Sequence, residues 1–299
     1  MTTAVVIIVL LAGAYVVAVL EGWATNGRFQ PAGPALDAVA LLGRESIITR
    51  SSDRIFLEVG PVLLLISALL AAAVLPLSPG LIITDLATGA LFVNAALAYV
   101  MVALVMAGWA PGGVYAMVGG WRFLGQLVGY SMLIVMPLTA VTMRAESLFT
   151  TQIVESQGAM WNVIFQPLGF VLFFLAALAV CFLPPFDLPT APGELAGGVM
   201  AEYTGARLAI MRLARLVLVV TLSVTITVFY LGGWLGPVLP PWAWTLGKSL
   251  LVAAAMLFAG RYVPRIREEH MLQWFWKFGI PLALLNILYV GIALLVVDK

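Results

Sequence analysis

Three carboxylates lie in a proline-framed segment between two long apolar runs of the sequence. The segment begins Pro-Pro-Phe-Asp-Leu-Pro at residue 184, and its acidic residues are Asp187, Glu194 and Glu202. Only 10% of all residues are charged, and burying an ionised carboxylate in hydrocarbon carries a large free-energy cost. Acids next to apolar runs of this length usually belong to an ion path, a ligand pocket or a subunit contact, so this segment is the first candidate site.

Residues that bind metals and redox centres are scarce, since the chain has one cysteine, Cys181, and one histidine, His270. A membrane haem usually needs a pair of axial ligands, and iron–sulfur clusters and structural zinc sites need about four ligands each. We therefore expect no metal site and no catalytic side chain, so electron transfer would use a cofactor on another polypeptide or a diffusible one. Cys181 is interpreted as a small apolar residue at a helix end. The net charge of +1 gives no reason to expect a nucleic-acid partner.

The apolar composition predicts the elements that position these residues. With 63% hydrophobic residues and a mean hydropathy of +1.09, the chain is predicted to be an all-α, polytopic integral membrane bundle, a single domain over residues 1–299. A bilayer core of about 30 Å needs about 20 apolar residues per helix. That length predicts eight spans, at residues 3–20, 55–77, 86–107, 122–143, 159–182, 208–233, 242–262 and 278–296.

A short surface helix is predicted after the first span, over residues 34–48. Leu36, Val39 and Leu42 offer apolar contacts there, so the helix is expected to lie in the headgroup layer. Its polar residues, which include Asp37, Arg44 and Glu45, form either a solvated face or the frame of an entrance for an amphipathic ligand.

The distribution of basic residues predicts the orientation. Eight spans place both ends of the chain on one side of the membrane. The loops on the other side, about 21–54, 108–121, 183–207 and 263–277, carry most of the lysine and arginine residues. By the positive-inside rule we expect these loops in the cytoplasm and both termini on the non-cytoplasmic side.

Five separated blocks of the sequence form a wider pattern. They are Glu21 with residues 27–30, then residues 34–48, 108–130, 185–205 and 264–286. In this order the blocks resemble the membrane subunit called H in bacterial respiratory complex I, which is subunit 1 in mitochondria, and its relatives in membrane-bound hydrogenases. A bacterial or archaeal cytoplasmic membrane is the expected location.

The resemblance implies a subunit at the heel of an L-shaped complex, between a hydrophilic redox arm and antiporter-like membrane subunits. It implies as partners those other subunits, the lipid bilayer and quinone, which would be a shared substrate in a chamber partly formed by the cytoplasmic loops. The implied chamber residues are Arg28, Asp37, Arg44, Glu45, Asp187 and Arg207. The implied proton-path residues are Glu21, Glu58, Asp187, Glu194 and Glu202.

Several charges of the family pattern are missing from this chain. Thr190 and Pro192 stand at two acidic positions of the central block, Leu183 replaces an arginine and Ser131 replaces a membrane glutamate. The first loop is also shortened between residues 30 and 34. Carboxylates relay protons only when they are close neighbours or are bridged by water, so a complete path cannot be counted from the sequence.

Three interpretations follow. The first is the heel subunit of a proton-translocating, complex-I-like quinone oxidoreductase. The second is the equivalent subunit of a membrane-bound hydrogenase or ferredoxin-linked complex, which the shortened first loop favours. The third is a stand-alone transporter or an assembly scaffold, since kinked helices with sparse acids fit those as well.

Overall fold

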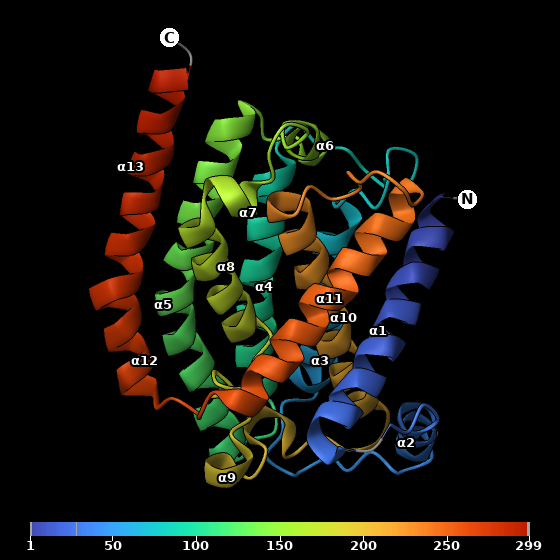
Figure 1. Ribbon diagram of the computed structural model, residues 1–299. Helices are drawn as coiled ribbons and strands as arrows, with labels where there is room; N and C mark the ends of the chain where they lie inside the picture. The colour runs from blue at the N-terminus through green and yellow to red at the C-terminus, as the bar shows by residue number, and fades with distance from the viewer. Residues whose placement is uncertain (1, 28, 298–299) are drawn as a thin grey trace.

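The computed structural model describes residues 2–27 and 29–297, and that part of the chain contains helices and no β-strand. The helices run side by side in one bundle, and α1 begins at the same end of it at which α13 finishes (Figure 1). The long helices are α1 (Thr2–Asn26), α3 (Arg54–Ala73), α4 (Gly89–Trp109), α5 (Val114–Ala145), α10 (Gly205–Tyr230), α11 (Pro241–Tyr262) and α13 (Ile280–Val297). The short ones are α2 (Gly33–Leu42), α6 (Thr150–Glu155), α7 (Asn162–Phe165), α8 (Pro167–Val180), α9 (Pro192–Leu195), η1 (Gly198–Met200), α12 (Glu268–Trp274) and η2 (Phe275–Gly279). The predicted all-α membrane bundle is confirmed.

Seven helical segments among the described residues are long and apolar enough to cross a bilayer, so the prediction of eight full spans is wrong at one place. The predicted span 159–182 consists of the four-residue helix α7 and the 14-residue helix α8, and α8 alone rises only about 21 Å. The break lies at Gln166, with φ −134° and ψ 69°. Pro167 follows it, and a proline disfavours helical geometry in the residue before it.

The broken segment still carries the chain from one end of the bundle to the other. Figure 1 places α7 near the upper end, α8 alongside α5, and α9 at the lower end. Both ends of the described chain therefore lie at the same end of the bundle, as eight passages require. Which side of a membrane that end faces stays a prediction.

Helix α10 forms the centre of the bundle, where it packs against α1, α3 and α11. Three of its hydroxyl side chains bond within the helix, whereas Thr221 donates to the Ala68 carbonyl of α3 at 3.3 Å. Each of the three hydroxyls donates to the backbone carbonyl one turn earlier. Ser223 donates to Val219 at 2.7 Å, Thr225 to Thr221 at 2.7 Å and Thr227 to Ser223 at 2.8 Å. Such bonding to the preceding turn lets hydroxyl groups be buried without partners from other helices.

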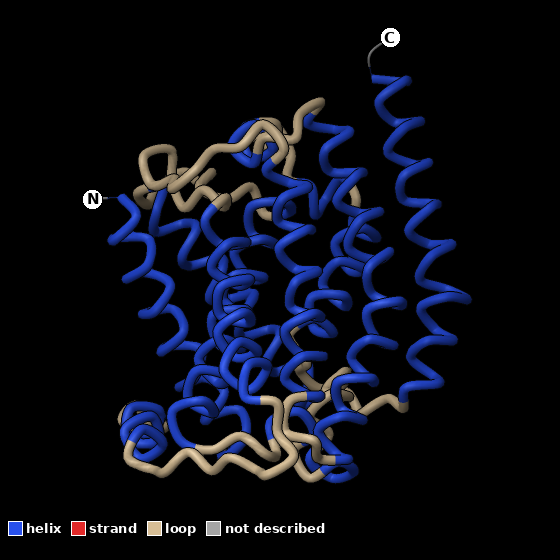
Figure 2. The backbone as a smooth tube through the Cα atoms, turned by 180° about the vertical axis from the view of Figure 1, so that it is seen from behind, coloured by secondary structure: helices blue, strands red, loops and turns tan. Residues whose placement is uncertain are grey.

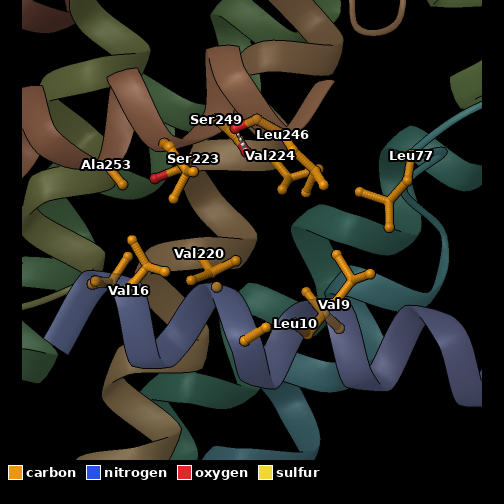
Figure 3. Close-up of a pocket in the computed structure, with 14 residues that line it drawn as sticks. Val9, Leu10, Val16, Leu77, Val220, Ser223, Val224, Leu246, Ser249 and Ala253 are labelled. Atoms are coloured by element: carbon orange, nitrogen blue, oxygen red, sulfur yellow. Dashed lines mark hydrogen bonds between the residues drawn. The ribbon is translucent and has the colours of Figure 1, made fainter. Parts of the chain in front are cut away.

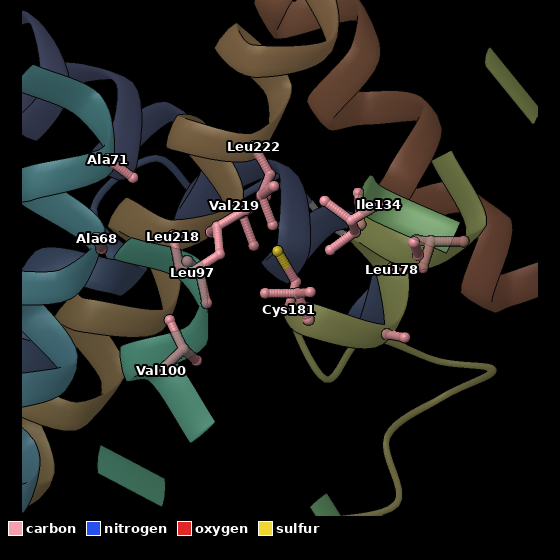
Figure 4. Packing of buried hydrophobic residues seen from close by; sticks show 14 of the residues in the cluster. Ala68, Ala71, Leu97, Val100, Ile134, Leu178, Cys181, Leu218, Val219 and Leu222 are labelled. Carbon is pink, nitrogen blue, oxygen red and sulfur yellow. The ribbon is translucent and has the colours of Figure 1, made fainter. Parts of the chain in front are cut away.

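Cys181 packs in this apolar core. It is a free, buried cysteine at the end of α8, and Figure 4 shows its sulfur directed toward Leu218, Val219 and Leu222 of α10. Its interpretation as a small apolar packing residue is confirmed.

The predicted surface helix is shorter than expected. Helix α2 spans Gly33–Leu42, and the residues after it run in an extended path across the end of the bundle. Leu41 is buried, whereas Leu36, Val39 and Leu42 are each more than 60% exposed. The apolar face of α2 therefore points away from the bundle, which is the arrangement of a helix that lies in a headgroup layer.

The loops gather at the two ends of the bundle (Figure 2). The extended path after α2, the segment after α8 and the connection between α11 and α12 lie together at the lower end. The four loops predicted to share one side of the membrane thus share one end of the structure.

Candidate functional site

The candidate site is the loop end, formed by residues 29–53, 110–113, 181–204 and 263–267. Hydrogen bonds connect these segments across long stretches of sequence. The Asp53 amide donates to the Ala110 carbonyl at 2.9 Å, the Ile47 amide donates to Thr204 Oγ1 at 2.9 Å, and the Ile266 amide donates to the Pro185 carbonyl at 3.3 Å. The loop end is therefore a joined structure in which each segment positions another.

The central segment of the loop end, residues 181–204, is anchored on α5. Gln126 is fully buried, and its Nε2 donates to the Ala179 carbonyl at 3.1 Å and to the Phe186 carbonyl at 3.0 Å. The Phe186 ring lies 5.5 Å from the ring of Phe275, which begins the π-helical turn η2. Turns of this type are frequent at functional sites, and here the turn holds an aromatic residue against the central segment.

Two glycines allow the central segment to fold tightly. Gly198 has a φ of +53°, and a Cβ atom there would collide with the Pro189 carbonyl oxygen. A Cβ atom on Gly119 of α5 would lie 2.5 Å from the same oxygen. Because that carbonyl accepts a hydrogen bond from the Val199 amide at 3.1 Å, both glycines are needed for the loop to close against α5.

Asp187 is the most deeply buried acid of the site, with 5% exposure. Its Oδ2 lies 2.7 Å from Arg265 Nη2, and its own carbonyl accepts the Ala191 amide at 2.8 Å. Burial raises the pKa of Asp187 above its ordinary value, while Arg265 and then Arg215 act in the opposite direction. The carboxyl therefore takes up a proton at a higher pH than an exposed aspartate does.

Glu194 lies on the outside of the same segment, and its side chain is 60% exposed. Arg122 of α5 reaches it, with Nη1 2.7 Å from Glu194 Oε2, and the Nε of the same guanidinium lies 3.7 Å from Glu268 Oε2. One arginine thus joins the central segment, α5 and α12.

Two more predicted acids pair with arginines of α10. Glu21 of α1 lies 2.9 Å from Arg215 Nη2, and Glu58 of α3 accepts from the Nε of Arg207 at 3.1 Å and also from its Nη2. Arg207 Nη1 and Arg215 Nε are buried and find no hydrogen-bond partner within residues 2–27 and 29–297. Each therefore has a donor left for water or a ligand.

The other predicted residues lie at the rim. Glu202 is partly buried next to Gly113, where a Cβ atom would lie 2.6 Å from Glu202 Oε1. Asp37, Arg44 and Glu45 are exposed, the first on α2 and the others on the extended path after it. Arg28 lies outside the described residues.

Of the four arginines that form ion pairs within residues 2–27 and 29–297, only Arg207 was among the predicted site residues. In the described part of the chain all five ion pairs join an arginine to a carboxylate, and three of these arginines, together with one acid, were not among the expected site residues. They are Arg122, Arg215, Arg265 and Glu268. A signal for them was present, because a buried or membrane-embedded carboxylate requires a cation; the sequence did not show which cation each acid meets.

A metal centre has no donor set here, since no group of three or more His, Cys, Asp or Glu side chains within the described ranges could hold an ion. The comparison with protein families gives a match over most of the chain. A family model described as NADH dehydrogenase matches residues 21–291, a range that contains the whole loop end and leaves out only the first part of α1 and the end of α13 among the helices.

Proposed function

The chain belongs to the NADH dehydrogenase family, the family of the complex I membrane protein that is called H in bacteria and subunit 1 in mitochondria, and we propose that its loop end forms part of a quinone chamber. The family makes the chain a membrane subunit of a complex-I-like oxidoreductase, whose partners are other subunits of such a complex. The proposed position is the heel, where a hydrophilic redox arm meets the proton-translocating membrane arm.

The observation that carries this proposal is the convergence of the loops around the buried Asp187 and its partly exposed partner Arg265. A chamber for a polar headgroup needs a fixed wall with a small number of oriented polar groups. The hydrogen bonds from Gln126 and Ile266 fix the segment that carries Asp187. A quinone is a neutral acceptor of hydrogen bonds and protons, so a protonatable carboxyl beside an arginine fits its chemistry.

The position of α2 supports the same proposal. Its exposed apolar residues indicate a helix lying at the depth of the headgroups, and it packs against α1 and α10. An amphipathic ligand that leaves the bilayer at this depth would meet the loop end directly.

A role in proton translocation is a second part of the proposal, and Glu202 is its best test. The other four predicted path acids, Glu21, Glu58, Asp187 and Glu194, each pair with an arginine. Glu202 enters no ion pair among the described residues. Undiminished proton pumping by a Glu202→Gln complex would remove that residue from the path.

The quinone chamber is tested by Asp187→Ala in the purified complex, with electron transfer to short-chain ubiquinone and menaquinone analogues as the measurement. We expect a loss of roughly tenfold to a hundredfold, because the substitution removes a polar group from the wall and unpairs Arg265. Electron transfer from the donor to an artificial acceptor that bypasses quinone should remain. The control is Asp85→Asn, in which an exposed acid at the opposite end of the bundle is changed. Full quinone reduction by the Asp187→Ala complex contradicts the proposal.

The equivalent subunit of a membrane-bound hydrogenase or ferredoxin-linked complex is a second candidate. The observation that favours it is the short connection between α1 and α2, where Asn26 and Gly33 end and begin consecutive helices. Hydrogen evolution by the purified complex, together with nickel-binding cysteines in its large catalytic subunit, would select this candidate over a quinone reductase.

A further inference from the structure

An apolar cavity of about 230 Å³ lies between α1, α10 and α11, away from the loop end. Figure 3 shows it, with Val9 and Val16 of α1 facing Val220 and Val224 of α10 and with Leu246 and Ala253 of α11 closing the opposite side. The cavity exceeds the engineered apolar cavity of about 150 Å³ that binds benzene in another protein. It is large enough for a stretch of hydrocarbon chain.

The lining offers a polar occupant no free hydrogen-bond donor and only two hydroxyl oxygens. The polar side chains in the lining are Ser223 and Ser249, and each hydroxyl donates within its own helix, to the Val219 carbonyl at 2.7 Å and to the Leu246 carbonyl at 2.9 Å. A buried water needs roughly two to four polar partners for its hydrogen bonds. The occupant is therefore apolar.

The cavity opens toward the surroundings of the bundle. Its floor is formed by buried residues of α10, whereas Ala12 and Val16 on α1 are exposed, Val16 by 39%. Both positions lie near the middle of the candidate span Thr3–Thr25, and the lining residue Leu250 lies near the middle of the candidate span Pro241–Gly260. An opening at the middle of a span faces the hydrocarbon of the bilayer, so the molecule that can enter the cavity is a lipid acyl chain.

We propose that a membrane phospholipid inserts one acyl chain into this cavity between α1 and α11. Left empty, the cavity walls would lose the dispersion contacts that close packing gives. The chain completes the packing of α1, which also contacts α10 directly at Gly13, where a Cβ atom would lie 3.2 Å from Val220 Cγ1. Because α1 carries Glu21, the partner of Arg215, the lipid supports the helix that holds one ion pair of the loop end. This inference does not depend on the quinone proposal.

The experiment uses the assembled complex in phosphatidylcholine vesicles that contain a phosphatidylcholine with a photoactivatable diazirine at the middle of one acyl chain. After illumination, the labelled residues are located by mass spectrometry. Two variants fill the cavity: Ala253→Phe from its buried wall and Ala12→Leu from its mouth. Matched controls add the same side chains outside it, at the exposed positions Ala255→Phe on α11 and Ala4→Leu on α1.

We expect label on lining residues such as Val220 and Ser249 in the parent complex and in both controls. In the filled variants that label should fall roughly tenfold, which corresponds to the loss of about two buried methylene groups, while label on the exposed face of α1 persists. Ala12→Leu keeps the test valid if Ala253→Phe fails to assemble, since position 12 is exposed. The proposal is overturned if the lining is not labelled, if filling leaves the label unchanged, if a partner subunit's peptide is found in the cavity, or if a long-chain quinone displaces the lipid.

Discussion

The two ends of the bundle hold their cations in different ways. At the loop end, Arg122, Arg207, Arg215 and Arg265 all pair with carboxylates. The far end is formed by residues 74–88, 146–166 and 231–240, and two cations of the adjoining helices α5 and α11 bind neutral oxygens and aromatic rings there. They are Arg144, which donates to Asn162 Oδ1 at 2.5 Å and to the Met160 carbonyl at 2.8 Å, and Lys248, which donates to three loop carbonyls.

This difference suggests that the ion pairs of the loop end serve function and that the cation contacts of the far end serve stability. A carboxylate–arginine pair changes its charge when the acid takes up a proton, so it responds to pH, to a ligand and to a partner subunit. A cation bound by carbonyls and rings has no carboxylate partner that could take up a proton. Lys248 also lies 4.3 Å from the ring of Trp161 and 5.5 Å from that of Trp244. We therefore expect the far end to dominate stability and the loop end to dominate activity.

The largest effect on stability is expected for Lys248→Met. Its ammonium group donates to the carbonyls of Leu231, Gly233 and Leu235 at 2.7, 3.1 and 2.8 Å, and methionine leaves all of them without that donor. The free energy of unfolding should fall by about 3 kcal/mol. Thermal unfolding of the detergent-solubilised complex measures it, with the exposed Lys277→Met as control. If Lys248→Met keeps the parent melting temperature but loses quinone reduction, the far end serves activity rather than stability, which contradicts this assignment.

Arg265→Ala is expected to have the next largest effect, because it leaves the buried Asp187 carboxylate without its cation. The pair is partly exposed on the arginine side, so we expect a loss of about 1–3 kcal/mol, between the values for exposed and buried pairs. Adding Asp187→Asn should restore part of that loss, since the amide needs no counter-ion. A double-mutant cycle of thermal unfolding tests this, and additive losses would show that the two side chains do not interact.

The long apolar elements of the fold were predictable, because hydropathy over about 20 residues reports membrane-spanning length directly. The break between α7 and α8 was not, because residues 159–182 are apolar apart from Asn162 and Gln166 and the prediction counted hydropathy alone. Pro167 carried the missing signal. A proline within a predicted span weakens the helical geometry of the preceding residue, which here is Gln166. Residues 43–48 were likewise assigned to a helix, whereas they extend to bond with Thr204.

The candidate site could be predicted as a set of acids but not as a set of pairs. Asp187, Glu194, Glu21 and Glu58 stood out because ionised groups are rare in this sequence. Their partners come from loops and helices distant in sequence, and Arg207 meets Glu58 across 149 residues. Pairing of that kind is set by helix packing, so it required the three-dimensional structure.

A smaller effect is expected in the pH dependence of stability. Because burial raises the pKa of Asp187 in the native state, the contribution of this group to stability is fully present below the unfolded pKa of about 3.9. It is lost as the pH rises through the higher native pKa. The parent should therefore lose stability relative to Asp187→Asn over that interval, by less than about 1.4 kcal/mol per pH unit. Unfolding measured between pH 4 and 7, roughly, gives both slopes. Asp85→Asn should keep the parent slope, and an Asp187→Asn slope identical to the parent would show that burial does not perturb this carboxyl.

The smallest effect on stability is expected for Glu194→Gln, which distinguishes an exposed ion pair of the loop end from the pair that contains the buried Asp187. Glu194 meets Arg122 with most of its side chain exposed, and exposed ion pairs contribute about 0–1 kcal/mol. Arg122 also keeps Glu268 as a second, more distant acid. The melting temperature should therefore stay within the error of the parent value. A loss as large as that of Arg265→Ala would mean that a neighbouring subunit buries Glu194 in the assembled complex, and repeating the measurement on the isolated chain would then remove the effect.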